Sequence, residues 1–172
     1  KGDIFSIYTN LYNYSFPEAV KELAKRVGVK ISENQSFQNK ENIKTLQILE
    51  LATDWFQKNL YINEESKKYL KQRSISDETI DTFRIGYSNN PKSSLYNYLK
   101  DLNFTSEQII KSNVVKLDKN NKLRDFFYKR LIFPIANEQN KVVGFGGRVL
   151  NDSTPKYLNS PESKFFKKRS LL

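Results

Sequence analysis

The sequence predicts an α+β fold in which mainly short helices are followed by a small antiparallel sheet. Up to residue 112, apolar side chains recur at the three- and four-residue spacings of amphipathic helices. From Val114 onward the pattern changes to short β-prone runs separated by turn residues. Helices that precede strands, instead of alternating with them, argue against a wound parallel sheet. With 38% apolar and 13% aromatic residues, the 172-residue chain can bury a packed core.

Two short helices are expected at the start of the chain. The first spans residues 4–12, with Asp3 placed to cap it. The second follows Ser15, carries Pro17 in its first turn and stops at Gly28. Because two such helices bury only a small core and the chain lacks an initiator methionine, we expect them to be the end of a module that begins further upstream.

The middle of the chain is expected to hold a linker and then a series of helices. Residues 31–42 are polar and weakly patterned, which is typical of a linker. A helix of about five turns is predicted over 43–60, with Trp55 as a packing anchor on its apolar face. Shorter helices are predicted over 63–73, after Ser76, and over 95–102 and 106–112, with N-caps at Asn63, Ser76 and Thr105.

Strands are predicted mainly in the last third of the chain. Residues 84–88 form one short β-prone run, and VVKL with the following DKNNK predicts a hairpin edge. The runs 131–136 and 141–146, joined by NEQN, predict an antiparallel hairpin. The glycine-dense GFGG (144–147) at the end of this second run predicts a turn that leaves Arg148 at a strand end with little bulk around it.

The positive charge of the chain is concentrated in its last third. The net charge is +10; residues 1–110 carry 15 Lys or Arg against 14 Asp or Glu, whereas residues 111–172 carry 14 against 5. A localised basic field attracts polyanions and gives salt-sensitive affinity. A solvated lysine-rich face is the alternative explanation.

Several classes of site are excluded by composition. Cysteine and histidine are both absent, which removes disulfides, thiolate or imidazole metal sites, and Cys or His catalysis. No run approaches 18 apolar residues and no basic-then-apolar leader is present. We therefore expect a cytoplasmic protein without a membrane partner.

The candidate binding residues lie between positions 148 and 168. Arg148 can fork onto phosphate or stack on a base, with a surface salt bridge as the alternative. The extended PKYLNSPE segment (155–162) carries Lys156 and Asn159 on a stiff strip. Lys168 stands in a basic cluster interleaved with two phenylalanines, as in single-strand grooves, although at least one ring is expected in the core.

No catalytic centre is predicted within these residues. GFGGRV lacks the third glycine of a dinucleotide fingerprint and the Gly-Lys-Ser/Thr ending of a phosphate loop. Glu162 is the lone acid beside the basic block, and one carboxylate cannot hold a two-metal site. The chain is therefore interpreted as a binding surface whose catalytic centre lies elsewhere.

Taken together, these motifs resemble the bacterial DnaG-type replicative DNA primases. The resemblance is carried by YLKQRSIS (69–76), FRIGYS (83–88), RLIFPIANEQNKVVGFGGRVL (130–150) and PKYLNSPESKFFKKRSLL (155–172). Residues 2–29 resemble the segment that follows the zinc-binding cysteines of that family. The match runs through almost the whole chain in the family's order.

The resemblance implies a fragment with two parts. Residues 1–30 would be the tail of a zinc-binding domain, without its metal ligands, 31–42 a linker, and 43–172 the N-terminal subdomain of the RNA polymerase core. The Toprim subdomain, whose carboxylates hold Mg or Mn ions, would begin after Leu172. The fragment alone is then expected to synthesise nothing.

The resemblance also implies which residues bind and what they bind. The family's basic residues fall on Arg73, Arg148, Lys156 and Lys168, with Asn159 beside them. Lys167-Lys168-Arg169-Ser170 departs from the family's His-Lys-Gly-Arg, which leaves the nucleotide-facing lysine open between Lys167 and Lys168. The expected partners are single-stranded template DNA, RNA–DNA heteroduplex and ribonucleoside triphosphates. A replicative helicase would be bound through a C-terminal region outside this sequence.

Other functions remain open on the sequence alone. A different nucleotidyl transferase or a nuclease with a Toprim-type partner would use the same basic surface. A plain single-stranded nucleic-acid-binding module, or an inert basic fold, would need no catalytic partner at all.

Overall fold

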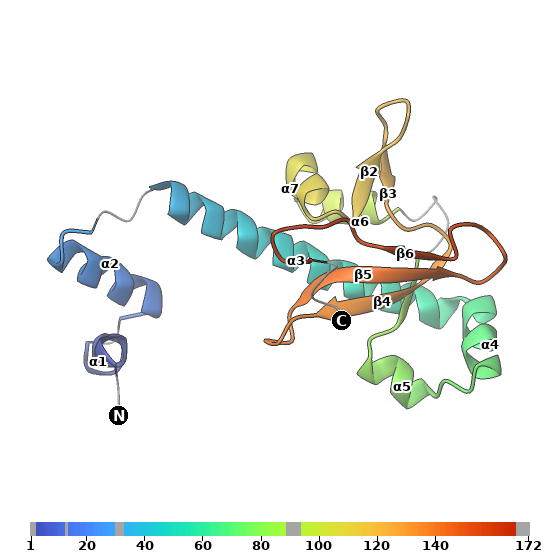
Figure 1. Cartoon of the computed structure of the whole chain (residues 1–172), viewed down its shortest axis with the longest axis horizontal. Helices are drawn as coiled ribbons and strands as arrows, with labels where there is room; N and C mark the ends of the chain where they lie inside the picture. The colour runs from blue at the N-terminus through green and yellow to red at the C-terminus, as the bar shows by residue number, and fades with distance from the viewer. Residues whose placement is uncertain (1–2, 13, 30–32, 89–93, 168–172) are drawn as a thin grey trace. The chain divides into compact units, whose positions relative to one another are not determined.

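The structure, a computed structural model, describes residues 3–12, 14–29, 33–88 and 94–167 (Figure 1). The chain divides into two compact units, Lys1–Glu41 and Asn42–Leu172. Helices precede a small antiparallel sheet, which confirms the predicted α+β class. None of the described helices combines the length and the apolar character needed to cross a membrane.

The first unit contains two short capped helices, as predicted. Helix α1 (Ile4–Leu11) begins after Asp3, whose carboxylate accepts the backbone N–H of Ser6 at 2.9 Å. Helix α2 (Phe16–Arg26) begins after Ser15, whose backbone N–H donates to the Glu18 carboxylate at 2.8 Å. Among the described residues of this unit, only Tyr8 and Ala19 are both apolar and buried. This unit therefore has a very small core of its own.

Helix α3 (Glu33–Ile62) begins earlier than the helix predicted over 43–60, because the backbone is already helical from Glu33 onward, within the stretch interpreted as a linker. The polar stretch is rich in Glu, Gln, Asn and Lys, residues that a helix tolerates once it has been nucleated. Extending an existing helix adds one backbone hydrogen bond per residue, so no apolar face is needed there. The apolar pattern marks only the part of α3 that packs, where Ile48, Leu49, Ala52 and Phe56 are buried.

Four shorter helices follow in the described part of the chain, and three of them have the N-caps that the sequence predicts. They are α4 (Glu64–Gln72), α5 (Asp77–Thr82), α6 (Leu95–Asp101) and α7 (Ser106–Lys111). The side chains of Asn63, Ser76 and Thr105 each accept a backbone N–H at their helix start. Such caps satisfy N–H groups that have no partner inside the helix.

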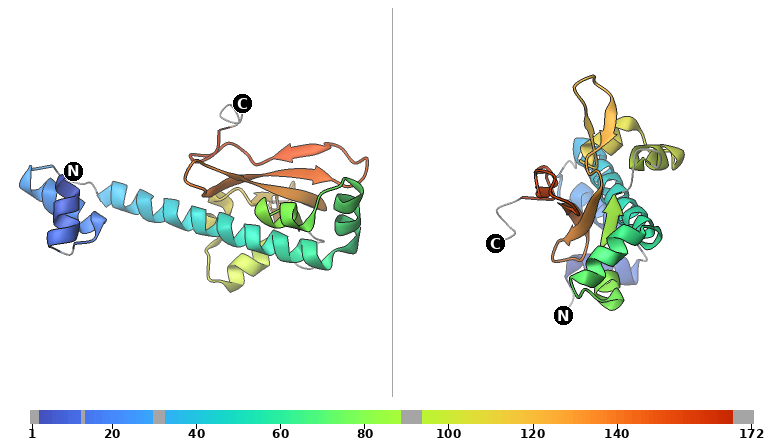
Figure 2. Two further views of the ribbon diagram at one scale, coloured as in Figure 1. Left: turned by 90° about the horizontal axis from the view of Figure 1, so that it is seen from below. Right: turned by 90° about the vertical axis from the view of Figure 1, so that its right-hand side faces the viewer.

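The main sheet has the strand order β1-β4-β5-β6 and is antiparallel throughout. Its strands are β1 (Gly86–Ser88), β4 (Arg130–Ala136), β5 (Val142–Val149) and β6 (Tyr157–Asn159). A separate hairpin pairs β2 (Val115–Leu117) with β3 (Leu123–Asp125). Figure 2 shows the main sheet lying along α3. The Phe56 ring of α3 meets the Phe145 ring of β5 edge to face at 5.4 Å.

The register of the sheet divides its side chains between two faces. Cross-strand partners share a face, and successive residues alternate between faces. The row Gly86, Ile132, Gly147 and Leu158 faces α3, and we call this the inner face. The neighbouring row Tyr87, Leu131, Arg148 and Tyr157 lies on the opposite, outer face.

Helices α4 and α5 cover only part of the outer face. Tyr87 and Leu131 pack there with Leu70 of α4 and Ile80 of α5 in a second hydrophobic cluster. Towards β6 the cover ends, and Tyr157 is 62% exposed. The outer face around Tyr157 is therefore open to a ligand, whereas Phe166 covers the same face at Gly144.

The glycines of GFGG lie inside β5, which corrects the predicted turn, while Arg148 stands one residue before the end of the strand, close to where it was predicted. They are there because side chains crowd the strand from both faces. A Cβ on Gly147 would stand 2.6 Å from Cδ1 of Phe127, and one on Gly144 would stand 3.2 Å from Cγ of Phe166. Phe166 is buried, as expected for at least one of the two phenylalanines.

Candidate nucleic-acid interface

Arg148 of β5 lies between two tyrosine rings on the outer face. Its guanidinium carbon is 5.3 Å from the ring centroid of Tyr157 on β6 and 5.6 Å from that of Tyr69 on α4. Its Nε atom is buried and has no hydrogen-bond partner. Aromatic rings attract the flat faces of a guanidinium but accept none of its in-plane N–H groups in the manner of an oxygen. The Nε–H group of Arg148 therefore has no oxygen acceptor in the described part of the chain.

Arg73 joins the same group through the Tyr69 ring. Its guanidinium carbon lies 5.5 Å from that ring centroid. Arg73 is the C-cap of α4, where its backbone N–H is fixed by the carbonyl of Leu70 at 3.0 Å. The structure thus brings together Arg73 and Arg148, which are 75 positions apart in the sequence. We call Arg73, Tyr69, Arg148 and Tyr157 the arginine–tyrosine cluster.

Asn159 extends this cluster along β6. It pairs with Gly146, two positions along β5 from Arg148, and so belongs to the outer face. Its Oδ1 atom would be 3.3 Å from a Cβ on Gly146, and the side chain is exposed. An exposed amide on the same face as the Arg148 guanidinium offers both a donor and an acceptor to a nucleotide.

The two lysines of the prediction have different outcomes. Lys156 is exposed, but what the structure anchors is its backbone: its carbonyl accepts the backbone N–H of Val149 at 3.2 Å and a guanidinium N–H of Arg130 at 3.4 Å. Lys168 lies outside the described residues, so its predicted role stays a prediction. Lys167, just before it, is exposed.

Sequence reasoning missed both tyrosines of the cluster. Tyr69 and Arg73 are four residues apart at the end of a predicted helix, a spacing that puts side chains on one helix face. That spacing was a signal that could have linked Tyr69 to Arg73. Tyr157 needed the register of β6 against β5, which a three-residue strand does not reveal.

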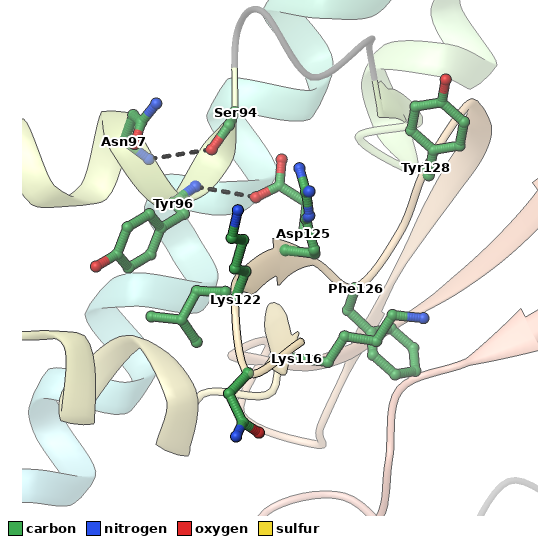
Figure 3. Close-up of a pocket in the computed structure, with 11 residues that line it drawn as sticks. Ser94, Tyr96, Asn97, Lys116, Lys122, Asp125, Phe126 and Tyr128 are labelled. Carbon is green, nitrogen blue, oxygen red and sulfur yellow. Dashed lines mark hydrogen bonds between the residues drawn. The ribbon is translucent and has the colours of Figure 1, made fainter. Parts of the chain in front are cut away.

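A second basic and aromatic feature lies at the β2–β3 hairpin. A cavity of about 680 Å³ is lined by Lys116, Lys122 and Arg124 together with Tyr96, Phe126 and Tyr128. Figure 3 shows Lys116, Lys122 and Tyr96 among the side chains around it. An adjoining cavity of about 500 Å³ shares Lys116, Phe126 and Tyr128 with it and extends to Arg130 and Pro155. Cations beside aromatic rings are a pattern used to bind single strands.

Asp125 in the first cavity has a structural role. Its carboxylate accepts the backbone N–H groups of Leu95 and Tyr96 at 2.8 and 3.0 Å, which holds the start of α6. Figure 3 shows the hydrogen bond from Tyr96. Burial raises the pKa of its carboxyl group above the ordinary value, although these two N–H groups act in the opposite direction. The described residues contain no group of three or more acids that could hold a metal ion.

The family of this chain follows from a comparison with family models. Residues 55–172 match the model described as the N-terminal domain of the DNA primase catalytic core. The chain belongs to the DnaG-type DNA primase family. The resemblance found in the sequence motifs is thereby confirmed.

Individual relatives and solved structures agree with this assignment. A DNA primase of Clostridium acetobutylicum is 39% identical over 175 residues, which cover 99% of this chain and 29% of the relative. The zinc-binding and RNA polymerase domains of the Aquifex aeolicus primase give a TM-score of 0.69 at 31% identity, covering 97% of this chain and 40% of that one. A DnaG primase catalytic domain bound to single-stranded DNA gives 0.66 at 31% identity, covering 75% and 42%.

This chain corresponds to only part of its relatives. It spans about 30% of the length of the curated primases that it matches. Within the primase family, the chain therefore corresponds to the catalytic-core N-terminal domain together with the residues that precede it.

Proposed function

We propose that this chain is the template-holding part of a primase that makes short RNA primers on single-stranded DNA. In this proposal the open outer face binds the template strand, the growing RNA–DNA heteroduplex and the incoming ribonucleoside triphosphate. The arginine–tyrosine cluster is the observation that carries the proposal. Family membership supports it, as does the related catalytic domain described as bound to single-stranded DNA.

The chemistry of the cluster suits a nucleic-acid backbone. Arg73 and Arg148 supply two permanent positive charges, and a guanidinium fork matches two phosphate oxygens. Tyr157, which is exposed beside Arg148, offers a ring on which a base can stack. The amide of Asn159 can contact a base edge or a sugar hydroxyl. The phosphate contacts, the base stacking and the amide contact would then come from the adjacent strands β5 and β6 and from the end of α4.

The basic and aromatic cavities at the β2–β3 hairpin offer a continuation of the template path. Lys116 lies 5.5 Å from the Phe126 ring centroid, and Lys129 lies at the same distance from that of Tyr128. A single strand that leaves the outer face could place phosphates on these lysines and bases on these rings. Lys156 and Lys168 are assigned to the phosphates of the incoming nucleotide or the heteroduplex.

The metal chemistry of the full-length primase belongs to other residues. The described residues offer no cluster of acids for the Mg or Mn ions, and the chain has no cysteine or histidine for zinc. We infer that carboxylates beyond Leu172 hold the catalytic ions and that residues before Lys1 hold the zinc. A replicative helicase and a cytoplasmic location belong to the same proposal. The chain by itself is expected to bind template and to synthesise nothing.

The test is the salt dependence of single-stranded DNA binding by this chain. Fluorescence anisotropy with a labelled oligonucleotide is measured over a salt series for the wild type and for R73A, R148A, K156A and K168A. We expect weak wild-type binding that falls steeply with salt. The logarithm of the binding constant falls linearly with the logarithm of the salt concentration, and we call the steepness of this line the salt slope. Each substitution should reduce the salt slope by about 0.7 to 1 unit, because each removes one phosphate contact.

Two exposed lysines provide matched controls for the loss of charge. Lys58 on α3 and Lys100 on α6 are both exposed and belong to neither the cluster nor the cavities. K58A and K100A should keep the wild-type slope. Equal binding by the wild type and all site variants would show that the basic block is only a solvated face, and the proposed interface would be wrong.

The alternative function is a single-stranded nucleic-acid-binding module without a polymerase. Both functions predict the same binding by this chain, because both use the same cations and rings. They differ in the parent protein, where a primase would extend primers from ribonucleotides on a single-stranded template. The family assignment favours the primase.

A further inference from the structure

The Tyr69 ring is shared by two arginines that come from different elements. The guanidinium carbons of Arg73 and Arg148 lie 5.5 and 5.6 Å from its centroid. Both distances are within the range in which a ring attracts a cation. Tyr69 itself is half-buried at the edge of the cluster formed by Leu70 and its neighbours, so its ring is held in place.

The two arginines have no acidic partner where the structure describes the chain. The ion pairs found there involve other residues, such as Arg84 with Glu50 and Asp54. Two positive charges beside one ring repel each other, and the ring compensates only part of that repulsion. An anion placed between them would relieve it. A phosphate group of a nucleic acid provides such an anion in a geometry that guanidinium groups match.

The position of Arg148 depends on rings because hydrogen bonds do not fix it. Its Nε is buried and unpaired, whereas a structural arginine such as Arg130 donates to the carbonyl of Pro155 at 2.9 Å. Tyr157 is exposed and stands on a three-residue strand, so it is the weaker of the two supports. Tyr69 is therefore the side chain best placed to hold the guanidinium of Arg148 in one orientation.

We propose that Tyr69 is a positioning residue that joins Arg73 and Arg148 into one two-cation phosphate clamp. This inference rests on the proposed function, since it assigns the clamp to a phosphate of the bound strand. Tyr69 acts through the arginines and contributes its ring, not its hydroxyl group. Without the ring the two cations remain in the chain but lose their common geometry.

The first measurement compares Y69F with Y69L in single-stranded DNA binding. Y69F keeps the ring and should bind like the wild type. Y69L keeps an apolar side chain but removes the π-face for both arginines, and cation–π contacts correspond to about two- to thirtyfold in affinity. We expect Y69L to bind about tenfold more weakly. Y61L, which removes an exposed tyrosine at the end of α3 outside the cluster, should bind like the wild type.

The second measurement tests whether the arginines depend on Tyr69. The single-stranded DNA affinity is measured for R73Q, R148Q and the double variant R73Q/R148Q, each with Tyr69 present and each in combination with Y69L. With Tyr69 present, the double substitution should cost less than the product of the two single effects, because removing either arginine already opens the clamp. In the Y69L background the two effects should be small and independent.

A third measurement observes Arg148 directly, without nucleic acid. The Nε–H signal of a buried guanidinium nitrogen should exchange slowly with water in an NMR spectrum. Adding a short single strand should shift it. Y69F should preserve this signal. In Y69L the Nε–H should exchange with water as fast as in an exposed arginine, and its chemical shift should move to the average value of exposed arginines. Thermal unfolding of each variant shows whether the fold is intact.

The outcomes separate this inference from the proposed function. If R148Q binds like the wild type, the interface itself is wrong. If R148Q weakens binding but Y69L binds normally and leaves the Nε–H signal unchanged, the interface stands and the role of Tyr69 is wrong. If Y69F loses binding as fully as Y69L, the hydroxyl group matters, and the positioning role of the ring is also wrong.

Discussion

Arg130 is a buried cation that has main-chain partners in place of a carboxylate. Its guanidinium donates to the carbonyls of Pro155 and Lys156 at 2.9 and 3.4 Å, and burial lowers its pKa. These contacts fasten the segment that leads into Tyr157. Arg130 therefore supports the outer face without contacting a ligand there.

Replacing Arg130 by lysine should loosen that segment. Lysine lacks the planar fork of a guanidinium, so at least one of the two hydrogen bonds to these carbonyls is lost, at a cost of about 1–3 kcal/mol in the free energy of unfolding. Urea unfolding of R130K measures this cost. R124K is the control, since Arg124 is exposed and its pairing with Asp118 is worth little. Equal unfolding free energies for R130K and the wild type would contradict the supporting role.

At the scale of residues, the sequence could predict cations but not their rings. Arg148 and Asn159 were found because they lie within one short basic stretch, and the structure places them on the same face. Arg73 came from the family resemblance, since nothing local links it to β5. The pairing of Tyr69 with Arg148 joins a helix to a strand, and such long-range contacts leave no periodic signal.

Strand β1 approaches the α3 backbone closely, and Gly86 permits this approach. A Cβ at this position would stand 2.4 Å from Cβ of Phe56 and 2.6 Å from its backbone carbon. Because backbone atoms of a packed helix cannot move aside, G86A should destabilise the fold by at least about 1–3 kcal/mol. Thermal or urea unfolding measures the loss.

Gly146 provides the matched comparison for G86A. A Cβ there would meet only Oδ1 of the exposed Asn159 side chain at 3.3 Å, and that atom can move. G146A should therefore cost less than about 1 kcal/mol while displacing Asn159 at the interface. If G146A destabilised the chain as much as G86A, the close packing of β1 on α3 would not explain why position 86 is a glycine.

For helices and strands, local sequence signals such as N-caps predicted the structure correctly, whereas the lack of an apolar pattern did not mean that a helix was absent. The caps at Asn63, Ser76 and Thr105 are local hydrogen bonds, and all three predictions were confirmed. The polar stretch over 31–42 has no apolar face, yet it is helical from Glu33 because it continues a packed helix. The GFGG glycines indicated a turn, but two of them, Gly144 and Gly147, lie within β5 where side chains pack closely on the two faces of the strand.

At the scale of the whole molecule, the α+β class could be predicted but the strand order could not. The change of period near Val114 is visible in the sequence. The placement of β1, from the helical half, beside β4 depends on pairing across more than 40 residues. The same pairing brings α4 next to β5 and so creates the arginine–tyrosine cluster.

The described cluster residues all belong to the compact unit Asn42–Leu172, which contains both hydrophobic clusters. Removing residues 1–32 leaves α3 and this unit complete. We therefore expect the shortened chain to keep its single-stranded DNA affinity and salt slope, and R148A to reduce that slope as it does in the full chain. Anisotropy titrations of the two lengths, with and without R148A, measure this. A flat salt dependence in the shortened chain would show that residues 1–32 carry part of the interface, whereas loss of its cooperative unfolding would show that the unit is not independent.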